Sequence, residues 1–168
     1  MRIWRTDGEC VRVLRGHREW VYTLDFAPLG DKLCSGSFDG TLRVWDVING
    51  VCLCVIKRPG VSFHSVRFRP GDGMLVAAAS SEKVMRLFRV SDGEMAGAFA
   101  GHTGAVTCVS FQPGAGLSVV TGSIDCTLRV WCVSDGRCTS ILGHRSTGKV
   151  MSLADLCDRG IEPRRPLR

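Results

Sequence analysis

The chain has 168 residues, and its 22 Lys and Arg outnumber its 16 Asp and Glu, so its net charge is +6. The longest run of small apolar residues, 74–79, is too short to cross a bilayer, which argues against a membrane protein. Nine cysteines show no metal-ligand spacing, and only Cys52 and Cys54 lie close together. Their odd number predicts free thiols inside the cell, in the cytoplasm or nucleus. We expect no metal and no cofactor.

An arginine placed two residues before an aromatic residue recurs four times along the chain. The four pairs are Arg2 and Trp4, Arg43 and Trp45, Arg86 and Phe88, and Arg129 and Trp131. The aromatic positions lie 41, 43 and 43 residues apart. A period in this range predicts a repeat architecture, in which each unit buries its apolar face against its neighbours.

Turn signals recur at the same spacing and divide each period into short strands. Asp7-Gly8, Asn49-Gly50, Asp92-Gly93 and Asp135-Gly136 are dipeptides typical of tight turns. The sequence predicts two strands at 2–5 and 9–15, and then strands at 20–26, 32–37, 41–46, 50–56, 62–68, 74–80, 84–89, 94–100, 105–111, 117–123, 127–132 and 137–142. A further apolar run, 149–153, could begin another unit.

One period contains Gly16-His17, then Ser35-Gly36-Ser37, Asp39 and finally Trp45-Asp46. This order resembles the WD-repeat β-propeller family over about residues 1–142. The resemblance implies an all-β fold with three full four-stranded blades and a partial blade at each end. The expected divisions are 1–15 for the last two strands of a preceding blade, 16–57 for blade 1, 58–100 for a degenerate blade 2, 101–142 for blade 3, and 143–168 for the start of a further blade and a basic tail.

Two sets of polar residues have the side-chain types of a catalytic site. They are His17, Ser35, Asp39 and Trp45, and again His102, Thr121, Asp125 and Trp131. A hydroxyl, an imidazole and a carboxylate could form a hydrolase triad, but the resemblance implies a buried hydrogen-bond network with the indole. A hydroxyl bound to a buried tryptophan cannot reach a substrate, so we expect no catalytic residues and no enzyme.

Blade 2 departs from this pattern at four positions at once. Pro59 replaces the histidine, Ala78 the hydroxyl residue, Glu82 the aspartate and Phe88 the tryptophan. Losing one member would leave the others buried without partners, whereas losing all four removes the conflict. The sequence therefore predicts that blade 2 folds as an apolar blade without a polar network.

The resemblance also implies a partner-binding rim where the Gly-His connection meets the aspartate turn. Carried onto this chain, the rim residues are Trp20, Tyr22, Phe38, His64, Thr107 and Ile124. Three of them are aromatic and belong to blade 1, and large rigid aromatic side chains often dominate binding energy. The alternative is that these rings pack against a neighbouring blade.

The recurring arginines raise the question of a phosphate-binding track. Alternation along a strand places each arginine on the same side as the following aromatic residue. We expect packed stems and solvated head groups between blades or towards a rim, with no aromatic platform for nucleic acid.

A seven-bladed ring would need about 300 residues, so this chain is too short to close one alone. Three explanations remain open: a fragment with open sheet edges, a small ring closed by residues 149–153, or a dimer of two arcs. Open edges would also permit self-association.

Two classes of function follow. One is a scaffold or adaptor that binds proteins or peptide segments within a multiprotein complex, through the blade 1 rim. The other is a subunit of a ribonucleoprotein or chromatin assembly in which positive charge meets nucleic acid. A ubiquitin-ligase adaptor is not favoured, because the Trp-Asp-x-Arg box of such family members would need a basic residue at Ile48.

Overall fold

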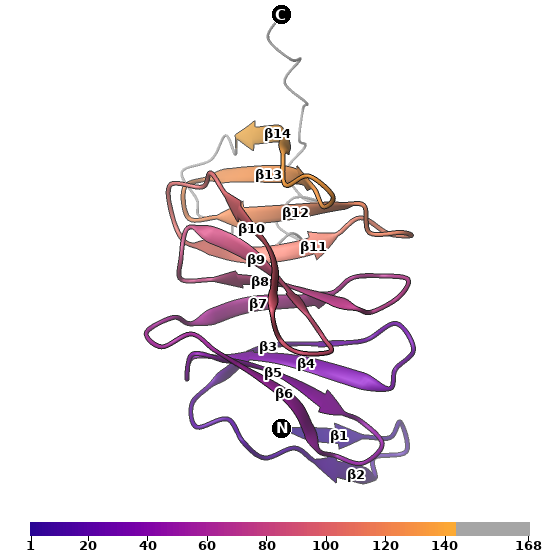
Figure 1. Cartoon of the computed structure of the whole chain (residues 1–168). Coiled ribbons are helices and arrows are strands. Elements are labelled where there is room, and N and C mark those ends of the chain that lie inside the picture. Colours follow the sequence, from indigo (N-terminus) through magenta and orange to yellow (C-terminus); the bar gives the residue numbers. More distant parts are fainter. Residues whose placement is uncertain (144–168) are drawn as a thin grey trace, which may run out of the picture.

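The computed structural model describes residues 1–143, which form fourteen β-strands and no helix (Figure 1). The strands are β1 (Arg2–Trp4), β2 (Cys10–Val13), β3 (Val21–Phe26), β4 (Lys32–Ser37), β5 (Thr41–Asp46), β6 (Cys52–Lys57), β7 (Phe63–Phe68), β8 (Leu75–Ser80), β9 (Val84–Arg89), β10 (Met95–Ala100), β11 (Val106–Phe111), β12 (Ser118–Ser123), β13 (Thr127–Cys132) and β14 (Cys138–Gly143). The expected run 149–153 lies outside the described residues.

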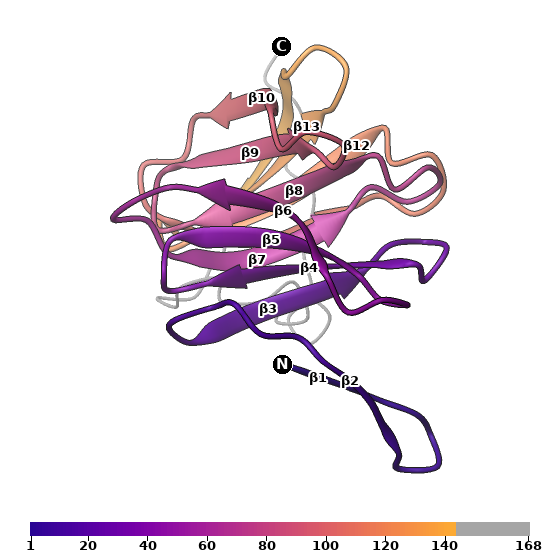
Figure 2. The same ribbon diagram turned by 60° about the horizontal axis from the view of Figure 1, so that its bottom comes forward.

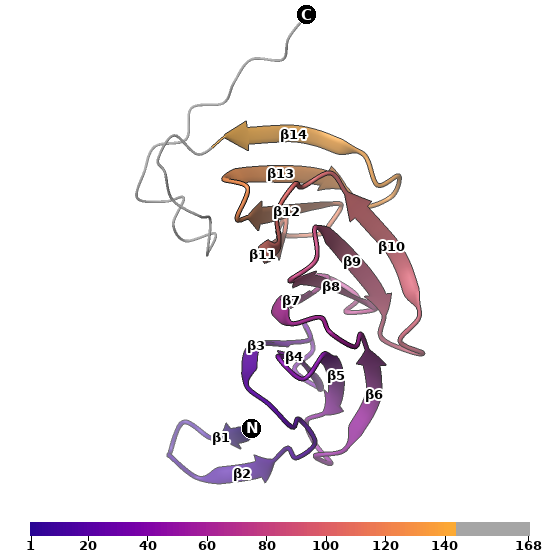
Figure 3. The same cartoon turned by 90° about the vertical axis from the view of Figure 1, so that its left-hand side faces the viewer.

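Neighbours in the chain pair antiparallel and form four separate sheets. β3–β6 form blade 1, β7–β10 blade 2 and β11–β14 blade 3, while β1 and β2 form a two-stranded sheet that we call the half-blade. Figure 3 shows the blades side by side in an arc, with β3, β7 and β11 on its inner side and β6, β10 and β14 on its outer side. The expected all-β fold of four-stranded blades is confirmed.

The apolar core lies between successive blades rather than inside a single sheet. One cluster joins blade 1 to blade 2, and a second joins blade 2 to blade 3. Cys34, Leu42 and Val44 of blade 1 pack in the first cluster with Val66 and Phe68 of blade 2. Alternation along each strand explains this arrangement, because successive side chains point to opposite faces and each face needs a neighbouring blade.

Side chains of one inner strand also accept hydrogen bonds from the backbone of the next. Thr23 Oγ1 accepts the N–H of Val66 at 3.2 Å, and Asp25 Oδ2 accepts the N–H of Phe68 at 2.8 Å. Burial raises the pKa of Asp25, although the Phe68 N–H opposes that shift. The inner strands are therefore matched by polar contacts as well as by apolar packing.

The half-blade covers only the outer part of blade 1. Met1, Ile3 and Leu14 from the half-blade region pack against Leu33 and Trp45.

Within residues 1–143, no helix is long and apolar enough to span a membrane. No three His, Cys, Asp or Glu side chains in this part of the chain are grouped so that they could hold a metal ion.

Candidate functional site

A chain of buried hydrogen bonds connects four elements of blade 1. The indole N–H of Trp45 on β5 donates to Ser35 Oγ on β4 at 2.9 Å. Ser35 Oγ lies 2.7 Å from Nε2 of His17, and Nδ1 of His17 lies 2.9 Å from Asp39 Oδ2. The Thr41 hydroxyl donates to Asp39 Oδ1 at 2.6 Å. We call the set His17, Ser35, Asp39 and Trp45 the latch of blade 1, because it ties the loop before β3 to the turn after β4.

The protonation states in this latch follow from burial and from the hydrogen bonds. Burial lowers the pKa of His17 despite the nearby carboxylate, so the imidazole is neutral. Burial alone would raise the pKa of Asp39, but bonds from Thr41, the Arg18 N–H and His17 hold it well below its usual range. An ionised carboxylate only accepts, so Nδ1–H of His17 donates to it. Nε2 is then the acceptor, and the Ser35 hydroxyl donates to it.

Blade 3 repeats this arrangement with threonine in place of serine. Trp131 Nε1 donates to Thr121 Oγ1 at 2.8 Å, and Thr121 Oγ1 lies 2.8 Å from Nε2 of His102. His102 Nδ1 lies 2.9 Å from Asp125 Oδ2. The Thr121 hydroxyl has no exposed surface, and nor does that of Ser35 in blade 1. Neither hydroxyl can meet a substrate, so the geometry is that of a structural network and not of a nucleophile.

Blade 2 holds a different polar contact at the same place, which corrects the expectation of an apolar blade. Glu82, at the position of Asp39 and Asp125, pairs with Arg58 at 3.1 Å and with Arg86 at 2.5 Å. Arg58 occupies the position of the glycine that precedes each latch histidine. The blade lacks the hydrogen-bonded chain through tryptophan but keeps a three-residue ion-pair cluster.

The recurring arginines also differ from expectation, because their head groups are not simply solvated. The guanidinium carbon of Arg43 lies 5.8 Å from the ring centre of Trp45, and that of Arg129 lies 5.9 Å from that of Trp131. Nε of Arg129 is the one buried side-chain nitrogen or oxygen without a hydrogen-bond partner in the described part of the chain. These arginines stack on the latch tryptophans, which leaves them poorly placed to form a phosphate-binding track.

Three exposed aromatic side chains gather at the latch end of blade 1, and a fourth ring from blade 2 joins them. Trp20 lies just before β3, Tyr22 on β3, Phe38 just after β4, and His64 on β7. The backbone N–H of Phe38 donates to the Trp20 carbonyl at 2.9 Å, and the Ser37 hydroxyl donates to the same carbonyl at 2.9 Å. We call Trp20, Tyr22, Phe38 and His64 the rim patch.

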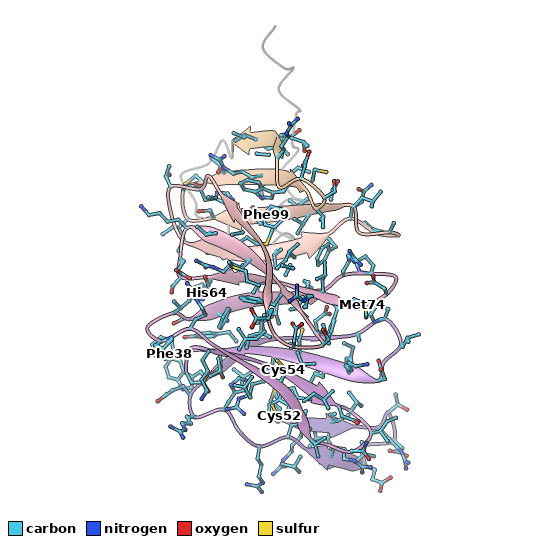
Figure 4. The ribbon with its side chains drawn as sticks, viewed as in Figure 1. Phe38, Cys52, Cys54, His64, Met74 and Phe99 are labelled. Carbon is cyan, nitrogen blue, oxygen red and sulfur yellow. The ribbon has the colours of Figure 1, made fainter. Side chains whose placement is uncertain are left out.

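The rings of the rim patch contact one another and leave much of their surface in solvent. The ring centres of Trp20 and Phe38 are 6.3 Å apart, those of Tyr22 and Phe38 6.2 Å, and those of Tyr22 and His64 5.9 Å. Trp20 is 72% exposed, Phe38 52% and Tyr22 47%. Figure 4 shows Phe38 and His64 at one end of the blades, with Met74 at the opposite end.

The other two expected rim residues carry no aromatic ring and take no part in the ring contacts of this patch. Thr107 and Ile124 belong to blade 3, which blade 2 separates from blade 1 along the arc (Figure 3). The Thr107 hydroxyl donates to the Gly122 carbonyl at 3.1 Å, and Ile124 is partly exposed. Ring contacts thus join four of the six expected residues.

Comparison with known proteins gives the family. Residues 8–46 and 93–132 match the family described as WD domain, G-beta repeat. The chain is 30% identical over 116 residues to pre-mRNA-processing factor 19 homolog 2 of Arabidopsis thaliana, which covers 66% of this chain and 22% of that protein. It is 34% identical over 110 residues to a guanine nucleotide-binding protein subunit beta of the same plant, covering 61% of this chain and 29% of that protein.

A shorter stretch resembles ribosome biogenesis protein erb1 of Aspergillus fumigatus, with 40% identity over 77 residues, 45% of this chain and 10% of that protein. The chain therefore spans less than a third of the length of each of these relatives. The matched repeats, the four-stranded blades and the two latches together identify the chain as a member of the WD-repeat family.

Proposed function

We propose that this chain is a non-catalytic scaffold of an intracellular multiprotein complex and that it binds protein segments through the rim patch. The observation that carries the proposal is the group of three exposed aromatic rings on a rigid frame. Large aromatic side chains bury much area at little cost in conformational entropy, so such groups are common centres of protein interfaces.

The surroundings of the rim patch support a preformed site. The latch fixes the loop before β3 and the turn after β4, which are the two segments that carry Trp20 and Phe38. Because the rings contact one another before any partner arrives, little rotamer freedom remains to be lost on binding. A peptide with apolar side chains would bury these rings, and Arg18 and Glu19, which directly precede Trp20, would contact its polar groups at the edge.

Proximity labelling in cells tests this proposal. The chain fused to a labelling enzyme is compared with a Trp20→Ala/Tyr22→Ala variant and with a Leu29→Ala/Met74→Ala control, whose changes are also at exposed apolar residues. Leu29 lies in the turn between β3 and β4, and Met74 lies just before β8, at the end of the blades opposite to Phe38 and His64 (Figure 4). We expect the rim variant to lose a defined set of neighbours that the control retains. An identical set of labelled proteins in all three samples would contradict the proposal.

A second candidate function is membership of a ribonucleoprotein or chromatin assembly. It is favoured by the net charge of +6 and by the names of two relatives, a pre-mRNA-processing factor and a ribosome biogenesis protein. Binding to a generic RNA that weakens steeply as salt rises would support this alternative. RNA binding that is absent at low salt would rule against it.

A further inference from the structure

The ion-pair cluster of Arg58, Glu82 and Arg86 belongs to the blade in the middle of the arc. Blade 2 packs against blade 1 on one face and against blade 3 on the other, so both faces of the blade that carries the cluster are covered. Figure 2 shows the connection from β6 to β7 at the same end of the blades as the turns from β4 to β5 and from β8 to β9. The cluster therefore lies at the same end of the blades as the rim patch.

Backbone and ring contacts join this cluster to the rim patch. The N–H of Arg58 donates to the Gly40 carbonyl at 2.8 Å, and Gly40 lies two residues after Phe38 in the turn from β4 to β5. The rings of Tyr22 and His64, 5.9 Å apart, connect blades 1 and 2 a second time at this end. A partner segment that covers the rings of the rim patch would therefore have the blade 2 cluster beside it.

The side chain of Arg58 accounts for the position of Arg86. In blade 1 the residue equivalent to Arg58 is Gly16, where an added Cβ would lie 2.5 Å from Nη1 of Arg43. Blade 3 has the same close approach between a glycine and an arginine. A side chain at this position thus excludes the guanidinium from the place that it takes in the latched blades, and Arg86 pairs with Glu82 instead.

The cluster carries more positive charge than its one carboxylate neutralises. Nη2 of Arg58 donates to both oxygens of Glu82 at 3.1 Å, and Arg86 donates to the same two oxygens through Nη1 and Nη2. Within residues 1–143, Nε and Nη1 of Arg58 have no hydrogen-bond partner, and its side chain is 37% exposed. Lys83, the next residue in the turn, is exposed as well. An anionic group from outside the chain could accept hydrogen bonds from these remaining donors.

Blade 2 has hydroxyl groups where blade 1 has aromatic rings. Ser62 and Ser81 stand at the positions of Trp20 and Phe38. The Ser62 N–H donates to Ser81 Oγ at 3.1 Å, so this oxygen is used as an acceptor and its O–H can still donate. The rim of blade 2 thus offers hydrogen-bond donors and positive charge, whereas the rim of blade 1 offers apolar rings.

We propose that Arg58, Lys83 and Ser81 form a subsite for one carboxylate of the partner segment, next to the rim patch. This subsite rests on the proposed function, since it specifies the chemistry of the same partner. The segment would place an aromatic or other large apolar side chain on the rings of blade 1 and an aspartate or glutamate on blade 2. Its carboxylate would share Arg58 with Glu82 and accept from the donors that Glu82 leaves unused.

The subsite suits a single anionic group better than a nucleic-acid backbone. A strand of RNA or DNA presents successive phosphates, and proteins bind it along a positively charged groove. In blades 1 and 3, however, the arginines equivalent to Arg86 stack on the latch tryptophans, so the excess charge at this end does not continue from blade to blade. One carboxylate is the ligand that matches one cluster.

Selection from a phage-displayed library of short random peptides supplies the probe. The library is selected on the unmodified chain and, in parallel, on the Arg58→Gln chain. We expect the unmodified chain to enrich peptides that combine a large apolar residue with an aspartate or glutamate at a fixed spacing. The Arg58→Gln chain should retain the preference for the apolar residue and lose that for the acidic one.

A peptide enriched on the unmodified chain is then synthesised with a fluorophore, and its affinity is measured by anisotropy. Arg58→Gln should weaken binding about fivefold. Glu82→Gln should strengthen it about fivefold, because Glu82 competes with the peptide carboxylate for the same guanidinium. Arg89→Gln makes the same change in charge at the opposite end of β9 and should leave the affinity unchanged. A peptide with the acidic residue replaced by its amide should respond to none of the three variants.

The outcomes separate this subsite from the proposed function. Peptides that need Trp20 and Tyr22 for binding, but that lack an acidic residue or bind the Arg58→Gln chain equally tightly, would overturn the subsite and leave the proposed function intact. Failure to select any peptide that needs Trp20 and Tyr22 would overturn both.

Two further results would also overturn the subsite. Weaker binding in both Arg58→Gln and Glu82→Gln would show that the cluster acts only by stabilising the rim, because a loss of stability cannot produce opposite effects. Displacement of the acidic peptide by a generic single-stranded RNA, lost in the Arg58→Gln chain, would assign the cluster to phosphate groups instead.

Discussion

The latch and the rim patch of blade 1 lie at the same end of the blade and use similar residue types in opposite ways. In the latch, Trp45 is buried and its indole N–H is bonded to Ser35, whose hydroxyl is bonded in turn to His17. In the rim patch, Trp20 is largely exposed and its ring contacts only other rings of the patch among the aromatic side chains. The difference indicates that the latch stabilises the fold, whereas the rings of the rim patch remain largely in solvent.

Blade 3 shows that these two features vary independently. It contains the same latch, with bond lengths within about 0.1 Å of those in blade 1 for the matching histidine and tryptophan contacts. Its rim positions, however, are occupied by Ala105, Thr107 and Ile124. One frame therefore supports different surfaces, as expected for a repeat whose units share stability requirements but not binding partners.

Removing a latch imidazole should have the largest effect. His102→Ala removes the imidazole that joins Thr121 to Asp125, so the buried Thr121 hydroxyl loses its acceptor and the Asp125 carboxylate loses one of its donors. We expect a loss of about 3 kcal/mol in the free energy of unfolding. Denaturant titration measures this loss. The matched control is His64→Ala, which removes a ring from the rim patch and should cost less than about 1 kcal/mol. Equal losses in the two variants would contradict the distinction between latch and rim.

Breaking the ion-pair cluster of blade 2 should have an intermediate effect. Glu82→Gln leaves Arg58 and Arg86 facing each other without a carboxylate, and we expect a loss of about 1–2 kcal/mol by the same titration. Asp92→Asn removes the exposed pair with Arg89 and should change the free energy by less than about 0.5 kcal/mol. If Glu82→Gln has no effect, the cluster does not replace the latch energetically.

Mild acid should weaken the latches. Burial lowers the pKa of both His17 and His102 below the ordinary value of 6.5, so the unfolded chain binds more protons than the folded chain as pH falls through this range. Stability is therefore fully present above pH 6.5 and declines below it. The unfolding temperature between pH 7.5 and pH 5.5 measures this decline, and a His17→Gln/His102→Gln variant should show a shallower slope. A rise in stability towards pH 5.5 would contradict the assignment of neutral imidazoles.

A small gain is expected at one strained turn position. Cys126 has a φ of 64°, and the equivalent position in blade 1 is Gly40 with a φ of 76°. Side chains disfavour this left-handed conformation, so Cys126→Gly should stabilise the chain by about 0.5–1 kcal/mol. Gly40→Ala is the opposite change and should destabilise it, because its added Cβ would lie 2.7 Å from the Arg58 carbonyl oxygen. Loss of stability in Cys126→Gly would argue against strain at this turn.

The sequence was sufficient to predict where the strands lie, with small errors at their ends. The expected ranges 32–37, 41–46, 84–89 and 127–132 match the observed strands, because period-2 patterns between clear turn signals define them. The outer strand of blade 1 was expected at 50–56 but spans Cys52–Lys57. Gly50 has a φ of 72° and belongs to the turn, and a bulge shifts the register at the start of this strand.

The sequence was less informative about contacts between elements. Two substitutions together were the signal for the ion-pair cluster: Arg58 stands at the position of Gly16 and Gly101, and Glu82 stands at that of Asp39. Considered singly, each substitution only removes a residue of the usual repeat pattern. The exposure of Leu24 and Phe26 could not be inferred at all, because their residue types match those of the buried positions in blades 2 and 3. Only the presence or absence of a neighbouring strand distinguishes them.

Comparison of two tryptophan variants is the most direct test of whether the latch stabilises the fold while the rim patch contributes little to the free energy of unfolding. Trp45→Ala removes a buried ring and its bond to Ser35, and we expect it to lower the free energy of unfolding by about 3–5 kcal/mol. Trp20→Ala removes an exposed ring and should lower it by less than about 0.5 kcal/mol. Both are measured by denaturant titration under the same conditions. A loss for Trp20→Ala that approaches that of Trp45→Ala would contradict the account, because the rim patch would then be part of the core.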